Sequence, residues 1–288
     1  MKRREFLTYT AAAAGALMLP SFTLASKKKM GLQLYTLRDV IMKDVAGTLK
    51  QVAGLGYQEL ETFGYGDGKL FGMPSSEFTS LVKGLGMKIT SGHYGTGQGN
   101  PAAKGTLVND WERAVADAKE AGQEFMVVAY LQDSERKSLD DYKKVCELIN
   151  KSAEVCKKYG IRLGYHNHAF EFDKIDNQVP YDLMLKELDA KNVSMEMDLY
   201  WVVNAGQDPL QFFAKYPGRF EQWHVKDMDK TDRGLQVNVG TGRIDFKAIF
   251  AKASQAGLKH LYVEQEAYPI NPIESIKANA DYVKKQLL

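Results

Sequence analysis

The sequence contains little cysteine and no long run of apolar residues. Two cysteines, Cys146 and Cys156, stand among 288 residues, which excludes a disulfide-framework fold and a four-cysteine zinc module. If both lie in one helix, their ten-residue separation puts them about 15 Å apart, too far to form a disulfide. The longest apolar run, Ala11–Leu19, is much shorter than the roughly 20 residues that cross a bilayer.

The chain also lacks a strong excess of charge. Its 38 basic and 36 acidic residues give a formal net charge of +2, so we expect neither a nucleic acid nor an anionic membrane as partner. With 44% apolar residues, wholesale disorder is excluded.

The first 25 residues are typical of an export signal. A charged start with paired arginines, Lys2-Arg3-Arg4-Glu5-Phe6-Leu7, precedes the apolar stretch, and Thr23-Leu24-Ala25 offers small residues for cleavage. Arg-Arg-x-Phe-Leu resembles the twin-arginine signal, which exports proteins already folded. A Sec-type leader or an amphipathic helix is the alternative.

We therefore predict a twin-arginine-type signal peptide over residues 1–25 and a periplasmic mature protein. Removal of this segment takes away three basic residues and one acidic residue, so the formal charge falls from +2 to 0. No stable membrane insertion is expected after processing, and an oligomer is compatible with the sequence.

One pattern repeats between Met30 and Leu288: a helical segment ends at glycine, and a β-rich segment begins a few residues later. The β-rich segments Tyr57–Phe63, Met87–His93, Phe125–Tyr130, Arg162–His166, Phe220–Lys226 and Leu261–Glu266 follow Gly56, Gly86, Gly122, Gly160, Gly218 and Gly257. Glycine suits a helix end that needs positive φ, and Asn192, before Val193–Asp198, is the next-best residue for that conformation. With Met30–Tyr35, eight strands are predicted.

The segments between these strands have helical periodicity. It is clearest in Val45–Leu55, Trp111–Ala121, Tyr142–Tyr159 and Ile273–Leu287, and Asp140 and Asp245 stand where N-caps belong. Strands that alternate with helices pair in parallel, and eight such units in about 250 residues match a (β/α)8 barrel.

The alternative is an open doubly wound sheet, which carries a glycine-rich phosphate loop after its first strand. Gln33-Leu34-Tyr35-Thr36-Leu37-Arg38 stands there instead. We therefore predict the α/β class, with a single TIM barrel over residues 30–288.

Polar residues gather at the ends of the predicted strands, where TIM barrels carry out catalysis. These residues are Gln33 and Tyr35, Glu59 and Glu61, His93, Tyr130, His166 and His168, Glu196 and Asp198, His224 and Lys226, and Glu264 and Glu266. Parallel strands buried on both faces are normally apolar. The charges placed there need partners, and a divalent cation pairs several of them at once.

The last four strands supply the candidate metal ligands, which are His166 or His168, Asp198, His224 and Glu264. This mixed nitrogen and oxygen set suits Mn, Fe, Co or Zn better than Mg or Ca. The alternative is a hydrogen-bonded polar cluster that binds sugar without metal. His260 precedes the last strand at the opposite rim, so we expect it to be structural.

Five motifs resemble the xylose isomerase-like barrel family, often labelled sugar phosphate isomerase/epimerase. They are Gly164-Tyr165-His166-Asn167-His168-Ala169-Phe170-Glu171-Phe172, Met197-Asp198-Leu199-Tyr200-Trp201, His224-Val225-Lys226-Asp227, Val239-Gly240-Thr241-Gly242-Arg243-Ile244-Asp245-Phe246 and Val263-Glu264-Gln265-Glu266. The resemblance covers Met30 to about Leu288. It implies a divalent metal held by late strands, and chemistry at the carbons next to a carbonyl or hydroxyl.

By position, the resemblance implies Asp198, His224 and Glu264 as ligands. His166 stands where ketose epimerases of the superfamily carry a glutamate that is both ligand and base. Trp201 stands where many members have a histidine for a second metal, which argues for one ion. Glu61 and His93 resemble the recurring strand-two glutamate and strand-three histidine.

We expect a divalent-metal-dependent isomerase or epimerase that acts on a non-phosphorylated keto- or hydroxy-sugar through a metal-stabilised enediolate. Candidate acid/base groups are Glu264, Glu61, His168 and Lys226, and candidate substrate contacts are Tyr35, His93, Trp201, Glu266 and Arg243. A cation near Lys226 is expected to disfavour its ammonium form and lower its pKa. Arg243, beside Gly240-Thr241-Gly242, is the one hint of a phosphate site.

Two alternatives remain open at this stage. The same α-proton removal in a lyase or dehydratase eliminates a group from a 3-keto-glycoside or keto-polyol. The chain is alternatively a non-catalytic sugar-binding barrel. The small-molecule partner is a carbohydrate in each case.

Overall fold

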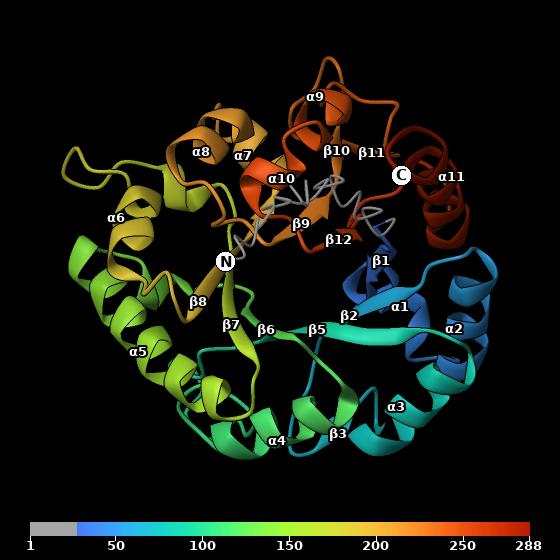
Figure 1. The fold of residues 1–288 in the computed structure, drawn as a ribbon, viewed down its shortest axis with the longest axis horizontal. Coiled ribbons are helices and arrows are strands. Elements are labelled where there is room, and N and C mark those ends of the chain that lie inside the picture. Colours follow the sequence, from blue (N-terminus) through green and yellow to red (C-terminus); the bar gives the residue numbers. More distant parts are fainter. Residues whose placement is uncertain (1–27) are drawn as a thin grey trace, which may run out of the picture.

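Eight parallel strands close into a barrel surrounded by helices (Figure 1). The computed structural model describes residues 28–288, and the predicted export signal at residues 1–25 lies outside this part of the chain. Around the barrel the strands follow the order β1-β12-β9-β8-β7-β6-β5-β2, and each runs parallel to its neighbours. The predicted TIM barrel is confirmed.

Five of the eight barrel strands are shorter than predicted, whereas β7 and β8 have the predicted bounds and β5 has the predicted length. They are β1 (Met30–Gln33), β2 (Glu59–Thr62), β5 (Lys88–Tyr94), β6 (Phe125–Val128), β7 (Arg162–His166), β8 (Val193–Asp198), β9 (Gln222–Val225) and β12 (His260–Val263). Lys226, Glu264 and Glu266 therefore lie just beyond their barrel strands. Two antiparallel hairpins lie in the loops: β3 (Lys69–Leu70) with β4 (Met73–Pro74), and β10 (Asp227–Met228) with β11 (Gln236–Val237).

Helices cover the outside of the barrel (Figure 1). They are α1 (Arg38–Ile41), α2 (Val45–Gly54), α3 (Ser75–Gly84), α4 (Trp111–Ala121), α5 (Leu139–Lys158), α6 (Pro180–Glu187), α7 (Leu199–Asn204), α8 (Pro209–Lys215), α9 (Phe246–Phe250), α10 (Ala253–Ala256) and α11 (Pro272–Gln286), with 3-10 turns η1 (Leu34–Leu37), η2 (Asp133–Glu135) and η3 (Phe170–Phe172). The last helix, α11, contacts β1 and β12, so the two ends of the barrel domain lie side by side.

The predicted helix starts are half right. Asp245 caps α9 and accepts a hydrogen bond from Ala248 N at 3.0 Å, as expected. The expectation for Asp140 is wrong, because Ser138 caps α5. Ser138 Oγ accepts from Asp141 N, and the Asp141 carboxylate accepts from Ser138 N, a reciprocal arrangement that satisfies two free backbone donors.

The glycines that end the helices have the predicted conformation. Gly56, Gly86, Gly122, Gly160, Gly218 and Gly257 all have positive φ. Gly257 also packs closely, since a Cβ there would lie 2.8 Å from the Cα of Gly218. The expectation for Asn192 is wrong: its φ is not positive. It instead closes a turn through its amide and the Asp189 carboxylate, 2.8 Å apart.

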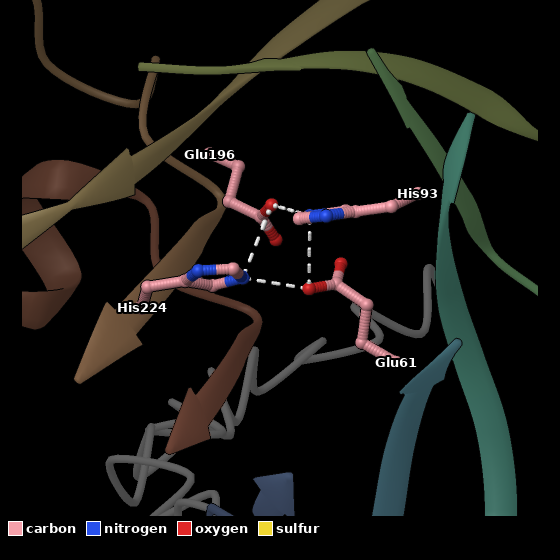
Figure 2. A group of neighbouring side chains, drawn as sticks. All are labelled: Glu61, His93, Glu196 and His224. Atoms are coloured by element: carbon pink, nitrogen blue, oxygen red, sulfur yellow. Dashed lines mark hydrogen bonds and ion pairs between the residues drawn. The ribbon is translucent and has the colours of Figure 1, made fainter. Parts of the chain in front are cut away.

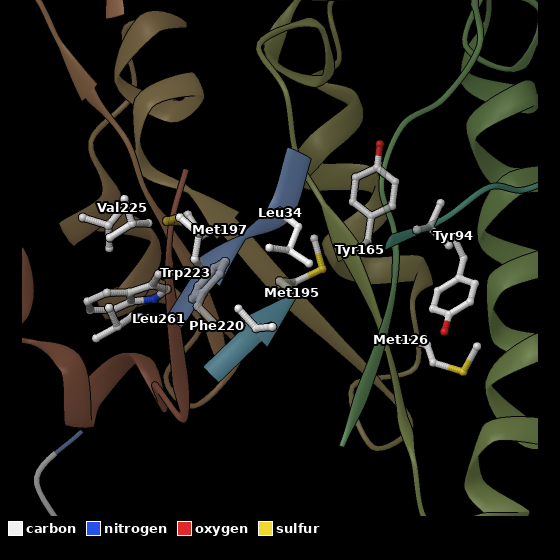
Figure 3. Packing of buried hydrophobic residues seen from close by; sticks show 14 of the residues in the cluster. Leu34, Tyr94, Met126, Tyr165, Met195, Met197, Phe220, Trp223, Val225 and Leu261 are labelled. Atoms are coloured by element: carbon white, nitrogen blue, oxygen red, sulfur yellow. The ribbon is translucent and has the colours of Figure 1, made fainter. Parts of the chain in front are cut away.

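The strands divide their side chains between two environments. On β9, Trp223 faces the helices and stacks on Phe213 of α8 with ring centroids 5.0 Å apart, while His224 faces the barrel interior. Figure 3 shows the buried apolar layer that Trp223 shares with Met195, Met197 and Leu261. The apolar core therefore lies between strands and helices, and the barrel interior is left for polar side chains.

The two cysteines form no disulfide, as predicted. Cys146 and Cys156 are both buried free thiols in α5. No helix within residues 28–288 is long and apolar enough to cross a bilayer.

Candidate active site and metal centre

Four side chains from neighbouring strands converge at the C-terminal end of the barrel. His166 ends β7, Asp198 ends β8, His224 lies in β9, and Glu264 follows β12. Each offers one donor atom, and the four atoms lie within 4.8 Å of one another. All four residues are buried, with 3% or less exposed.

Two of these ligand candidates are oriented by the backbone. His166 Nδ1 donates to the carbonyl of Ala129 at 3.2 Å, which leaves Nε2 as the free acceptor nitrogen. Asp198 Oδ1 accepts from Trp201 N at 2.9 Å as the N-cap of α7, so the other oxygen, Oδ2, points toward the remaining donors. Nε2 and Oδ2 then face each other at 3.5 Å.

His224 is oriented by a carboxylate. Its Nε2 lies 2.6 Å from Glu61 Oε2, and its Nδ1 lies 3.0 Å from Glu264 Oε2. A histidine that donates one ring N–H to a carboxylate has its other nitrogen available to a metal and fixed in direction.

The donor set fits a divalent cation. His166 Nε2 and Asp198 Oδ2 are buried and have no hydrogen-bond partner of good geometry among residues 28–288. Ligand atoms about 2.0–2.2 Å from a common metal are themselves ~3–4 Å apart, and the spacings of 3.0, 3.5 and 3.8 Å found between these donors match. Two imidazoles and two carboxylates suit Zn, Mn, Fe or Co.

Three carboxylates surround the Lys226 ammonium group. Its Nζ lies 3.0 Å from Asp198 Oδ2, 2.6 Å from Glu264 Oε2 and 3.1 Å from Glu266 Oε1. Burial opposes the charged form, but these three carboxylates outweigh it and raise the pKa of Lys226 well above its usual value. The lowered pKa expected beside a bound cation stays a prediction, and the sequence does not show how many carboxylates oppose that effect.

A second polar group lies deeper in the barrel, beside the first. Figure 2 shows Glu61, His93, Glu196 and His224 pointing toward one another from β2, β5, β8 and β9. His93 Nε2 lies 2.9 Å from Glu196 Oε2 and 3.2 Å from Glu61 Oε2. We call these four residues the inner group; its donor atoms also lie within 4.8 Å of one another.

The inner group carries opposite charges in close contact. For His93, burial opposes protonation, but Glu61 and Glu196 raise its pKa to about 9. Burial, helped by the charge of Glu61, raises the pKa of Glu196 to about 7. The sequence places Glu196 at a strand end, two residues before Asp198 and therefore on the same face of β8. It does not indicate what Glu196 contacts.

Two of the four candidate ligands, His166 and Glu264, line an open cavity of about 530 Å³. Of the predicted site residues, Tyr35, His93, His166, His168, Trp201, Glu264 and Glu266 line it. Glu61 and Lys226 are fully buried beneath it. Its volume lies in the range of about 300–1,000 Å³ that small-molecule sites occupy.

His168 is the predicted acid/base residue that lines this cavity without belonging to either group of ligand candidates. Its ring packs against Tyr130, 5.1 Å away, and against Trp201, 5.6 Å away, measured between centroids. Its Nδ1 has no hydrogen-bond partner within the described chain. Burial, then the charges of His166 and Lys226, lower the pKa of His168 to about 2, so the imidazole is neutral.

Asn167 and Glu171, in the same Gly164–Phe172 motif as His168, also position the site, and the sequence analysis did not assign them this role. Asn167 Oδ1 accepts from Asp198 N at 3.2 Å, so it ties β7 to a metal-ligand candidate. Glu171 accepts from His168 N at 2.9 Å and from the Tyr165 hydroxyl at 2.7 Å. Burial raises the pKa of Glu171 to about 7. The one feature of the sequence that pointed to these two residues is their place close to His166 and His168.

Arg243 does not reach the cavity. It is exposed and is not among the described residues that line the cavity. The glycine loop beside it is not free to bind phosphate, because the Asp227 carboxylate accepts from Gly240 N and Gly242 N at 2.9 Å each. The hint of a phosphate site is therefore not supported.

His260 lies at the opposite end of the barrel, as expected. Its Nδ1 is 2.7 Å from Glu59 Oε2. This buried pair joins β12 to β2, and we assign it a structural role.

Comparison with known proteins identifies the family. Residues 49–286 match the sequence description of the xylose isomerase-like TIM barrel. The chain belongs to the xylose isomerase-like TIM barrel family. A crystal structure of a sugar phosphate isomerase/epimerase from Parabacteroides distasonis is 30% identical, with a TM-score of 0.77 over 92% of this chain and 96% of that one.

Other similar proteins are more distant. An inosose dehydratase from Clostridium perfringens is 28% identical over 167 residues, 51% of this chain and 55% of the relative. One from Geobacillus kaustophilus is 26% identical over 188 residues, 59% and 58% of the two chains. The chain thus spans just over half the length of these curated relatives. The zinc-bound IOLI protein is 13% identical, covers 89% of this chain and 97% of its own, and shares the fold with a TM-score of 0.70.

Proposed function

We propose that the protein is a divalent-metal-dependent lyase that removes an α-proton from a keto-sugar or keto-polyol and eliminates a β-substituent. The observation that carries the proposal is the convergence of His166, Asp198, His224 and Glu264 beside a cavity of about 530 Å³. A divalent cation held by these residues supplies the Lewis acidity that lowers the cost of removing a proton next to a carbonyl.

The chain's own residues divide the remaining work. His168 lines the cavity and belongs to neither group of ligand candidates, so we propose its imidazole as the group that accepts the α-proton. Lys226 balances the negative charge of Asp198 and Glu264. Glu61, beneath the cavity, orients His224 and does not reach a substrate.

The relatives support elimination over the isomerisation favoured from the sequence. Those from Clostridium perfringens and Geobacillus kaustophilus are named for the dehydration of a keto-inositol. Isomerisation or epimerisation is the second candidate, because the 30%-identical structure is named an isomerase/epimerase. Both begin with the same proton transfer.

The cavity and the predicted leader favour a substrate without phosphate. The cavity lining described above has no lysine or arginine within residues 28–288. We also propose that the predicted leader exports the protein to the periplasm. Phosphosugars are usually confined to the cytoplasm, so an exported enzyme would meet sugars without phosphate.

Proton exchange in D2O tests the proposal. Metal-loaded mature protein is incubated with a keto-inositol and with a methyl 3-keto-glucoside, and products are followed by NMR. An unsaturated product supports the lyase, whereas deuterium at the α-carbon without elimination supports the epimerase. Exchange that survives metal removal, or no reaction with either substrate, contradicts the metal-dependent mechanism.

The base is tested with His168→Gln, which keeps a hydrogen-bonding side chain but not the basic nitrogen. Exchange should slow by ~10²–10⁴-fold, with metal affinity unchanged because His168 donates to neither group of ligand candidates. Exchange at the wild-type rate assigns the proton transfer to another residue.

A further inference from the structure

A second cavity, which we call the outer cavity, adjoins the first. It has a volume of about 670 Å³. Gly95, Tyr130 and Gln132 line both cavities, so the two lie next to each other. His166 and Glu264 line the first cavity but not the outer one.

The walls of the outer cavity are fixed by a buried carboxylate. One wall follows β5 and the other follows β6. Glu135, 4% exposed, accepts from Thr96 Oγ1 at 2.5 Å and from Gln132 N at 2.7 Å. These bonds hold the two walls together, so the space between them is part of the fold.

Two glycines keep this space open. A Cβ on Gly95 would have no neighbour closer than 3.9 Å, and one on Gly99 would contact Gln132 Cγ at 3.4 Å. Because both positions line the cavity, a larger side chain at either would extend into it.

The lining of the outer cavity is polar and almost uncharged. Asn100, Thr106, Gln132 and Ser134 offer amides and hydroxyls. The one ionised residue of the lining within residues 28–288 is Asp133, which forms an ion pair with Arg136. This lining complements a neutral, hydroxylated molecule and gives an anion nothing to pair with.

An aromatic side chain stands where the cavities meet. Tyr130 is 40% exposed, and its hydroxyl accepts from Arg136 Nη2 at 3.1 Å. Its ring also packs at right angles to Phe170. A tyrosine held in this way presents an apolar face and a polar tip, which suits the mixed surface of a sugar ring.

We propose that the outer cavity is a subsite for the leaving group and that it binds a second sugar ring. The substrate is then a keto-glycoside of at least two rings, with the keto-sugar at the metal-ligand candidates and the departing sugar beyond Tyr130. This inference rests on the proposed lyase function and extends it to the substrate class.

The elimination balances with no further reactant. In a 3-keto-glycoside, the base takes the proton from C2, the C2–H electrons form the C1=C2 double bond, and the bond from C1 to the glycosidic oxygen breaks. That oxygen takes up a proton and leaves as the hydroxyl of the second sugar. The products are an unsaturated keto-sugar and a free sugar, and no carbon is oxidised or reduced overall.

Blocking the outer cavity tests the proposal. Ser134 and Asn100 are exposed and line only this cavity, so Ser134→Trp and Asn100→Trp narrow it without touching the metal-ligand candidates. Ser254→Trp, on the surface of α10, adds the same bulk elsewhere. Turnover is compared for 3-keto-cellobiose and methyl 3-keto-glucoside, and calorimetry on the metal-loaded proteins compares cellobiose with methyl glucoside.

We expect KM for 3-keto-cellobiose to rise about tenfold or more in Ser134→Trp and Asn100→Trp. KM for methyl 3-keto-glucoside should change little in these variants, and KM for both substrates should change little in Ser254→Trp. Cellobiose should bind the wild type about tenfold more tightly than methyl glucoside and lose that advantage in Ser134→Trp. Equal binding of the two sugars, or equal losses for both substrates, overturns the subsite. If neither keto-glycoside turns over but the cellobiose preference depends on Ser134, the lyase proposal fails and the subsite stands.

Discussion

Glu61 should control metal affinity through His224, and β2 offers a matched control for this prediction. The strand carries two glutamates on one face, each bonded to a histidine: Glu61 to His224 at 2.6 Å and Glu59 to His260 at 2.7 Å. Only the first pair includes a metal-ligand candidate. Glu61→Gln and Glu59→Gln therefore make the same chemical change at opposite ends of the barrel.

Glu61 is surrounded by donors, which sets the size of the effect. Its Oε2 accepts from Gln33 Nε2 at 2.7 Å and its Oε1 accepts from Ser91 Oγ at 2.6 Å, in addition to His224. Glutamine has one acceptor oxygen, so its NH2 group must face one of these donors. Replacing a carboxylate that orients a ligating histidine lowers metal affinity ~10–100-fold, which corresponds to about 1.4–2.7 kcal/mol.

The assay is competition for Zn²⁺ or Mn²⁺ against a fluorescent chelator, with urea unfolding of each protein beside it. Each variant weakens a buried charge-assisted hydrogen bond, so each should lose roughly 1.5–3 kcal/mol of unfolding free energy. Only Glu61→Gln should lose metal affinity. Wild-type affinity in Glu61→Gln, or an equal loss in Glu59→Gln, would refute the assignment of Glu61 as the residue that orients His224.

Three further predictions follow from other parts of the molecule. Burial raises the pKa of Glu171 from 4.5 to about 7, so the unfolded chain loses this proton at a lower pH than the folded protein does. The free energy of unfolding should therefore fall by roughly 3 kcal/mol as the pH rises from about 4.5 to 7. Urea unfolding at a series of pH values should show this dependence in the wild type and not in Glu171→Gln. Asp227→Ala leaves backbone N–H groups of the glycine loop without their acceptor and should cost at least ~3 kcal/mol in the same assay, whereas a loss below about 1 kcal/mol means that water replaces the carboxylate. Replacing Arg3 and Arg4 together with lysine should keep the protein in the cytoplasmic fraction, and an unchanged distribution contradicts the twin-arginine route.

The parts of this protein that were predictable from its sequence depend on local rules. A glycine just past the end of a helix commonly takes positive φ, as Gly56 and Gly257 do, and this signal marks where the next strand is about to begin. The carboxyl ends of parallel strands meet at one end of a barrel. Asp198 and His224 could therefore be placed together before any contact was known.

The parts that were missed depend on how the strands are staggered. Glu61 is fully buried, and the pairing of β2 with β5 shifts register between Leu60 and Glu61. Nothing in the local sequence indicates that shift. The charge of Lys226 likewise depends on carboxylates from β8 and from the segment after β12. A sequence shows which side chains share a face, but the height of each within the barrel follows from closure of the whole sheet.

The Asp227 carboxylate has a consequence for the glycine loop. By accepting from the amides of Gly240 and Gly242, it places an internal anion where these backbone groups would otherwise bind an external one. An engineered anion site at this loop would therefore require more than added arginines. The loop would first have to lose the carboxylate that holds it in place.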